Sequence, residues 1–134
     1  MKGIFKPKFQ EMKFELDFQM VEFRPDGSVA GRNCGGTLSI GTIFTAVGRR
    51  VFPVLKPEDD ISDPGLEFVC AISLRLDSIE MYRRQFDFLS PGMTGWLGLS
   101  GTGFSTVQEM LARSEPHTYY SLLANINESG PHIN

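Results

Sequence analysis

The stretch "IEMYRRQFDFLSPGMTGWLGLSG", residues 79–101, is the part of the chain that decides its fold. It passes from an apolar segment through two adjacent arginines to a Pro-Gly turn, and it ends in a second apolar segment that is rich in glycine. Short apolar runs separated by turn residues are typical of β-strands. The stretch has no evident catalytic group, so it is either a working surface or only the wall of a β-structure.

The segment "KFELDFQM", residues 13–20, alternates between apolar and polar side chains. Period two predicts a strand with one buried face. The apolar positions on that face are Phe14, Leu16, Phe18 and Met20. The apolar phase shifts to Val21 and Phe23 after this segment, which predicts a bulge that curves the strand. The following "RPDGS" predicts a turn, because Pro-Asp-Gly residues suit the backbone angles of turns.

Two longer segments also indicate strands. Residues 37–54 are rich in β-branched and aromatic side chains, with Gly41 as a kink or turn. Residues 66–84 alternate over more than the usual length of a strand, which predicts a strand that bends between two walls of a sheet. The polar segment between them predicts a loop.

The pattern changes after Gly103. "STVQEMLARSE" has helical apolar spacing and Ser105 or Thr106 as its expected cap. "TYYSLLANINE", residues 118–128, suggests a second short helix. We therefore expect a β-barrel domain over residues 1–103 and a C-terminal helical tail over 104–134.

Composition limits the function classes. The chain has 134 residues and a net charge of −3, which argues against a general polyanion binder. Cys34 and Cys70 lack metal-like spacing, and we expect two reduced thiols. No apolar run is long enough for a signal peptide or a membrane helix. We expect a complete small cytoplasmic protein with no membrane partner and no cofactor.

Three candidate sites have a simpler alternative explanation. "GTGFST", residues 101–106, is either an anion-binding turn or an ordinary strand-to-helix turn. The acidic residues Glu58, Asp59, Asp60 and Asp63 form either a metal site or a solvated loop. His117 and His132 complete no recognisable catalytic triad. These features predict no enzyme.

The run "IEMYRRQFD" is the strongest functional signal. The guanidinium groups of Arg83 and Arg84 suit phosphates and carboxylates, and Tyr82 adds a flat face beside Glu80. The alternative is a strand end whose charges are only solvated.

At these residues the sequence resembles domain II, the β-barrel, of the translational GTPases, and most of all the elongation factor Tu type. Residues 80–84 match a glutamate-methionine-aromatic-basic-basic run, and Phe86-Asp87 match an apolar-aspartate pair. Pro91-Gly92 match the turn, and the strand that ends at Gly101 follows without a gap. "GRNCGGTLSIG", residues 31–41, is similar to a hairpin of the same family.

The resemblance implies an all-β fold: a six-stranded, closed, antiparallel barrel of the translation-factor type, here with a short C-terminal helical appendage. It also implies that Glu80 and Arg83 lie where the family holds the end of aminoacyl-tRNA, with Thr94 near the amino-acid pocket. The GTP-binding domain has no counterpart in this chain, so no nucleotide is expected.

Two functions follow as expectations. The first is a non-catalytic protein-interaction module, such as a small regulator or an immunity-type protein, with an unidentified protein partner. The alternative is an RNA-end or ribosome-related binding module. The expected contact residues are Glu80, Tyr82, Arg83, Arg84 and Thr94.

Overall fold

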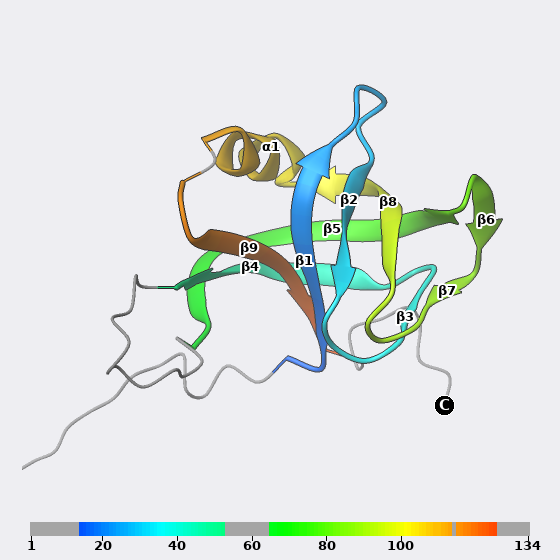
Figure 1. Ribbon diagram of the computed structural model, residues 1–134, viewed down its shortest axis with the longest axis horizontal. Coiled ribbons are helices and arrows are strands. Elements are labelled where there is room, and N and C mark those ends of the chain that lie inside the picture. Colours follow the sequence, from blue (N-terminus) through cyan, green and yellow to red (C-terminus); the bar gives the residue numbers. More distant parts are fainter. Residues whose placement is uncertain (1–13, 53–64, 114, 126–134) are drawn as a thin grey trace, which may run out of the picture.

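The computed structural model describes residues 14–52, 65–113 and 115–125. Within these residues the chain forms nine strands and one helix (Figure 1). The all-β class predicted from the sequence is therefore confirmed. The elements are β1 (Leu16–Phe23), β2 (Val29–Asn33), β3 (Leu38–Ser39), β4 (Ile43–Val51), β5 (Glu67–Met81), β6 (Arg84–Phe86), β7 (Phe88–Leu89), β8 (Thr94–Thr102), α1 (Phe104–Arg113) and β9 (Thr118–Ala124).

Six of the strands pair in a ring. The order is β4–β9–β1–β2–β8–β5, and β5 pairs back to β4; every pairing is antiparallel. β6 extends β5 as a hairpin, and β3 and β7 form a separate two-stranded sheet. The closure of the ring into a barrel of the translation-factor type stays a prediction.

The core lies inside the ring, and each ring strand contributes a fully buried apolar side chain to it. They are Phe18, Val29, Phe44, Leu74, Leu97 and Leu122. Such burial removes apolar surface from water and is the main favourable term in folding. The alternation seen in the sequence is what allows each strand to supply this face.

Two curvature features expected from the sequence are confirmed. The β1–β2 register shifts between Met20 and Glu22, so Val21 is the bulged residue. β5 has 15 residues and pairs with β4 over one part of its length and with β8 over another. One long bent strand therefore serves two walls of the ring.

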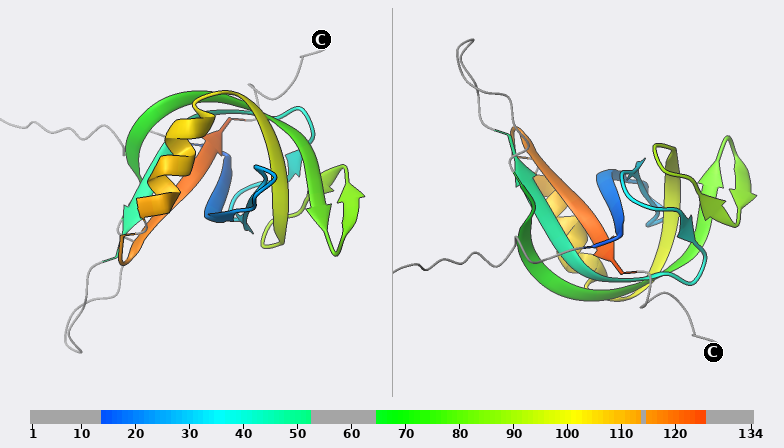
Figure 2. Two further views of the ribbon diagram at one scale, coloured as in Figure 1. Left: turned by 90° about the horizontal axis from the view of Figure 1, so that it is seen from above. Right: turned by 90° about the horizontal axis from the view of Figure 1, so that it is seen from below.

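The helix predicted after Gly103 is confirmed as α1. α1 lies over one end of the ring (Figure 2). Its side chains Val107 and Met110 are buried, and the ring of Phe104 meets that of Phe23 edge-on at 5.4 Å between centroids. Ser105 and Thr106 lie inside the helix, so the expected cap was wrong. The Val107 N–H instead bonds the carbonyl oxygen of Gly103, 3.1 Å away.

The prediction of a second short helix over residues 118–128 was also wrong. Residues 118–124 form strand β9, which pairs with β1 on one side and with β4 on the other. Residues 120–124 are all buried. A strand covered on both faces has no polar–apolar alternation, and this is why its sequence is hard to tell from that of a buried helix. The division at residue 103 into a domain and a tail stays a prediction.

Candidate functional site

The β5–β6 hairpin carries four of the five predicted contact residues: Glu80 on β5, Tyr82 and Arg83 in the turn, and Arg84 on β6. Met81 pairs with Arg84, and the two residues between them, Tyr82 and Arg83, form the turn. Tyr82 is 82% exposed, and both arginines are exposed. In Figure 1 the hairpin projects from the ring at the edge formed by β6. We call Tyr82, Arg83 and Arg84 the hairpin surface.

The turn has an unusual composition for its geometry. Tyr82 has φ 54° and Arg83 has φ 64°, so both central residues are in the left-handed region. Two-residue hairpin turns with positive φ at both positions favour Asn-Gly, because Asn and especially Gly tolerate this conformation. Tyrosine and arginine at these two positions therefore give a less stable turn than Asn-Gly would.

Glu80 is not part of the hairpin surface. Its Oε1 accepts a hydrogen bond from Nη2 of Arg24 at 2.7 Å, and both side chains are less than one-third exposed. Arg24 also lies over the ring of Trp96, with its guanidinium carbon 3.9 Å from the ring centroid. Trp96 faces Glu80 across the β5–β8 ladder. The carboxylate of Glu80 is therefore held by a neighbouring side chain and is only partly exposed.

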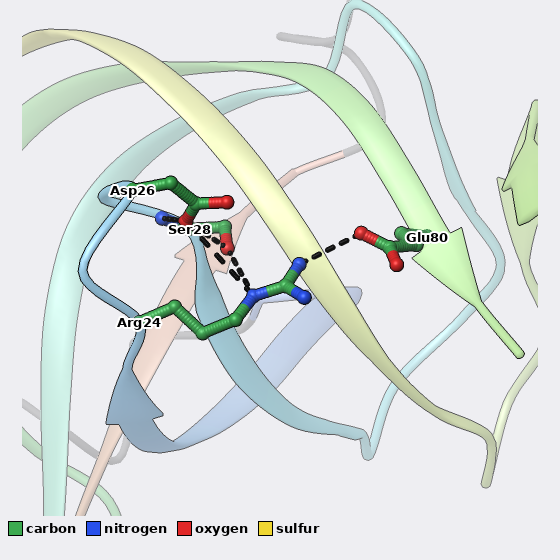
Figure 3. Close-up of polar contacts among 4 residues, drawn as sticks. All are labelled: Arg24, Asp26, Ser28 and Glu80. Atoms are coloured by element: carbon green, nitrogen blue, oxygen red, sulfur yellow. Dashed lines mark hydrogen bonds and ion pairs between the residues drawn. The ribbon is translucent and has the colours of Figure 1, made fainter. Parts of the chain in front are cut away.

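A tight turn holds Arg24 in this place. The Arg24 N–H bonds the Ser28 carbonyl at 2.8 Å, and the Arg24 side chain donates from Nε to the Ser28 hydroxyl at 2.9 Å. The backbone N–H of Ser28 donates to Asp26 at 2.9 Å, and this hydrogen bond is the main cause that lowers the pKa of the Asp26 carboxyl. Figure 3 shows the guanidinium of Arg24 between Ser28 and Glu80.

We call Arg24, Asp26, Ser28 and Glu80 the Arg24 cluster. It brings one guanidinium together with two carboxylates, so its charge at neutral pH is negative. A phosphate is repelled by such a cluster, whereas the two arginines of the hairpin surface have no carboxylate partner among the hydrogen bonds and ion pairs of the described residues. The Arg24 cluster is therefore negatively charged, whereas the hairpin surface is positively charged.

A shallow groove runs between the hairpin and β8. Glu80, Tyr82 and Thr94 all line it, together with Trp96. Thr94 is exposed at the start of β8. Arg83 and Arg84 do not line this groove. The structure thus brings three of the five predicted contact residues to one depression and leaves the two arginines beside it.

Sequence reasoning missed Arg24 and Trp96. Arg24 lies 56 residues before Glu80 and reads as part of a turn. The only local signal was an arginine next to "PDGS", a turn that hydrogen-bonds its own side chains. Nothing in the sequence showed which carboxylate this arginine meets.

The other sequence candidates stand as follows. Within residues 101–106, the first two end β8, Gly103 is the connection, and the last three begin α1. The acidic residues 58–63 and His132 lie outside the described residues. His117 is exposed in the turn before β9. Within residues 14–52, 65–113 and 115–125, no three His, Cys, Asp or Glu side chains are placed to hold a metal ion.

Both cysteines are free thiols. Cys34 is exposed, and Cys70 on β5 is half-buried. Burial raises the pKa of the Cys70 thiol, which lowers its share of reactive thiolate. Cys70 therefore lacks the lowered pKa of an activated nucleophile.

A comparison of the chain with protein-family models, with curated proteins and with solved structures finds no match. Among the described residues, α1 is the one helix, and it lacks the length and apolar character that a membrane span requires.

Proposed function

We propose that this chain is a non-catalytic protein-interaction module that binds a partner protein through the hairpin surface. The observation that carries the proposal is the turn at Tyr82 and Arg83, which holds two large side chains in a conformation that favours Asn-Gly. A left-handed conformation costs an ordinary residue about 1 kcal/mol. Strained backbone of this kind is concentrated at functional sites in proteins.

The chemistry of the hairpin surface suits protein recognition. Tyrosine and arginine are among the residues that contribute most to binding energy at protein interfaces. A two-residue turn between paired strands leaves little backbone freedom to lose on binding, so less of the interaction energy is lost to ordering. The exposed phenylalanine Phe88, on the next strand, adds apolar area near the hairpin.

The ring of strands supports a finer structural proposal. We propose that it is a closed barrel of the translation-factor type, related to domain II of the elongation factor Tu family. The support is the order of the six strands and the sequence blocks at residues 31–41 and 79–101. In this proposal the chain is a regulator or immunity-type protein of the cytoplasm.

An RNA-end or ribosome-related binding module is the second candidate. The observation in its favour is the groove that both Glu80 and Thr94 line. The family resemblance implies that Glu80 lies at the tRNA end and Thr94 near the amino-acid pocket. The hydrogen bond from Arg24 to Glu80 weighs against it, since this carboxylate would have to exchange partners to bind a ribose or a base. The negative Arg24 cluster weighs against it too.

The test replaces the turn by the residues that its geometry favours, as the double variant Tyr82→Asn/Arg83→Gly. We expect the free energy of unfolding to stay equal or rise by about 1 kcal/mol, because the strain is relieved. We expect a stoichiometric partner, captured from native lysate by the wild-type chain, to be lost. Retention of that partner by the variant, or no stoichiometric partner with either protein, would contradict the proposal.

A second measurement separates the two candidates. The wild-type chain and the variant Arg83→Ala/Arg84→Ala are titrated with a short single-stranded RNA that ends in CCA, at two salt concentrations. Salt-sensitive binding that the variant loses would favour the RNA candidate, because phosphate contacts release counterions. Absence of binding at both salt concentrations would favour a protein partner.

A further inference from the structure

The ladder between β1 and β9 ends partway along both strands. Their pairing runs from Leu16–Ala124 to Gln19–Ser121. Beyond that point residues 20–23 of β1 pair only with β2, and residues 118–120 of β9 pair only with β4, among the residues that the structure describes. Each strand therefore has an edge at which no other described strand pairs, and such an edge can serve as a template for pairing with another chain.

These two edges border the same opening. Met20 and Val21 of β1 line a groove together with residues 118–120 of β9 and with Met110 and Leu111 of α1. A second groove continues from Val21 and Leu111 along β1 and α1, where Glu22 and Ala112 line it. We call these two joined grooves the seam. In Figure 2, α1 lies over this end of the ring beside β1.

The seam combines apolar side chains with acidic ones. Val21, the bulged residue, is 65% exposed, so an apolar side chain is presented to solvent next to the free edge. Glu22 and Glu115 are exposed carboxylates that line the two grooves. No arginine or lysine of the described residues lines either groove.

We propose that the seam is a docking site for an extended basic segment of a partner protein, which adds as a strand to the free edge of β1 at residues 20–23. Strand addition uses main-chain hydrogen bonds for affinity, and alternate side chains give specificity. Here one set of side chains would be apolar, against Val21 and Leu111. The others would be lysine or arginine, paired with Glu22 and Glu115. This surface is separate from the hairpin surface.

The probe is a short synthetic peptide of alternating lysine and valine, titrated into the isotope-labelled full chain and followed by NMR. We expect saturable shift changes at the amides of Val21, Glu22, Leu111 and Ala112, and none at Arg83. The matched control peptide alternates glutamate and valine and should not bind. A peptide with an N-methyl group at every residue should also fail, because it has no backbone N–H donor for the ladder.

A charge-reversal variant tests the acidic contacts. Glu22→Lys/Glu115→Lys should bind the lysine–valine peptide roughly fivefold more weakly, since exposed ion pairs contribute little each. The variant Tyr82→Asn/Arg83→Gly should bind it as the wild type does, which keeps this test independent of the hairpin proposal.

Three results would overturn the proposal. The first is no shift change at millimolar peptide, and the second is equal binding of the N-methylated peptide. The third is a set of shifts at the seam that depends on protein concentration without peptide, which would make a second copy of the chain the occupant.

Discussion

At the scale of single residues, Asn33 shows how one polar side chain joins distant segments. It is fully buried at the end of β2. Its Nδ2 donates to the carbonyl oxygen of Gly36 at 2.9 Å and to that of Leu89 at 2.8 Å. Its Oδ1 accepts from the backbone N–H of Gly35 at 3.0 Å. The side chain therefore provides hydrogen-bond partners for backbone groups of Gly35, Gly36 and Leu89. These bonds hold the turn after β2 against β7.

We predict that Asn33→Ala lowers the free energy of unfolding by about 2–4 kcal/mol, because three hydrogen bonds are lost and the buried carbonyl oxygen of Leu89 loses its donor. Denaturant unfolding followed by Trp96 fluorescence measures this. The control Asn33→Asp keeps the shape and the acceptor but removes both donors of the amide, and it should also destabilise strongly. A loss below about 1 kcal/mol in both variants would mean that water replaces the side chain.

At the scale of elements, β9 is the one whose type the sequence did not reveal. The other long strands carry alternation or turn signals at their ends, as at Gly41 and Pro91-Gly92. β9 lacks alternation because both of its faces are covered, and Leu122 and Leu123 are both fully buried although they point to opposite sides. Local sequence cannot distinguish a strand that is buried on both faces from a buried helix, since the residues that bury it lie elsewhere in the chain.

We predict that a chain ending at Gly103 does not fold, because it lacks the strand that joins β1 to β4 in the ring. The matched control ends at Asn125, which keeps β9, and should fold. Amide NMR dispersion and thermal unfolding of the two proteins check this. A dispersed spectrum and a cooperative transition for residues 1–103 would instead support an independent domain with a separate tail.

At the scale of the whole molecule, the first and the last strands of the described chain are neighbours. β1 and β9 pair although about one hundred residues separate them. Long-range antiparallel pairing needs loop closure before it gains contacts, so it is expected to slow folding. α1 lies between β8 and β9 in the chain, and its Val107 and Met110 are buried, so we expect α1 and the ring to unfold together.

We predict a single unfolding transition with the same midpoint by Trp96 fluorescence, which reports on the ring, and by far-ultraviolet circular dichroism, which reports on all elements. Refolding should take milliseconds to seconds, as for other proteins rich in non-local strand pairing. Stopped-flow fluorescence measures this rate. Two separate midpoints would show that part of the chain unfolds on its own.

The sequence by itself determined the all-β class, the bulge after Met20, a long bent strand within residues 66–84, and the helix after Gly103. The structure ends this strand at Met81, before the turn at Tyr82 and Arg83. These features depend on periodicity and turn chemistry, which act over a few residues. The sequence also singled out Tyr82, Arg83 and Arg84, because two guanidinium groups beside an aromatic ring suit a binding surface.

Only the tertiary structure decided what the remaining groups do. It paired Glu80 with an arginine 56 residues away, so this carboxylate already has a hydrogen-bond partner within the chain. It also turned residues 118–124 into a strand and left the seam open beside α1. The physical reason is the same in each case: the partner that determines the outcome lies far along the chain, and only folding brings it near.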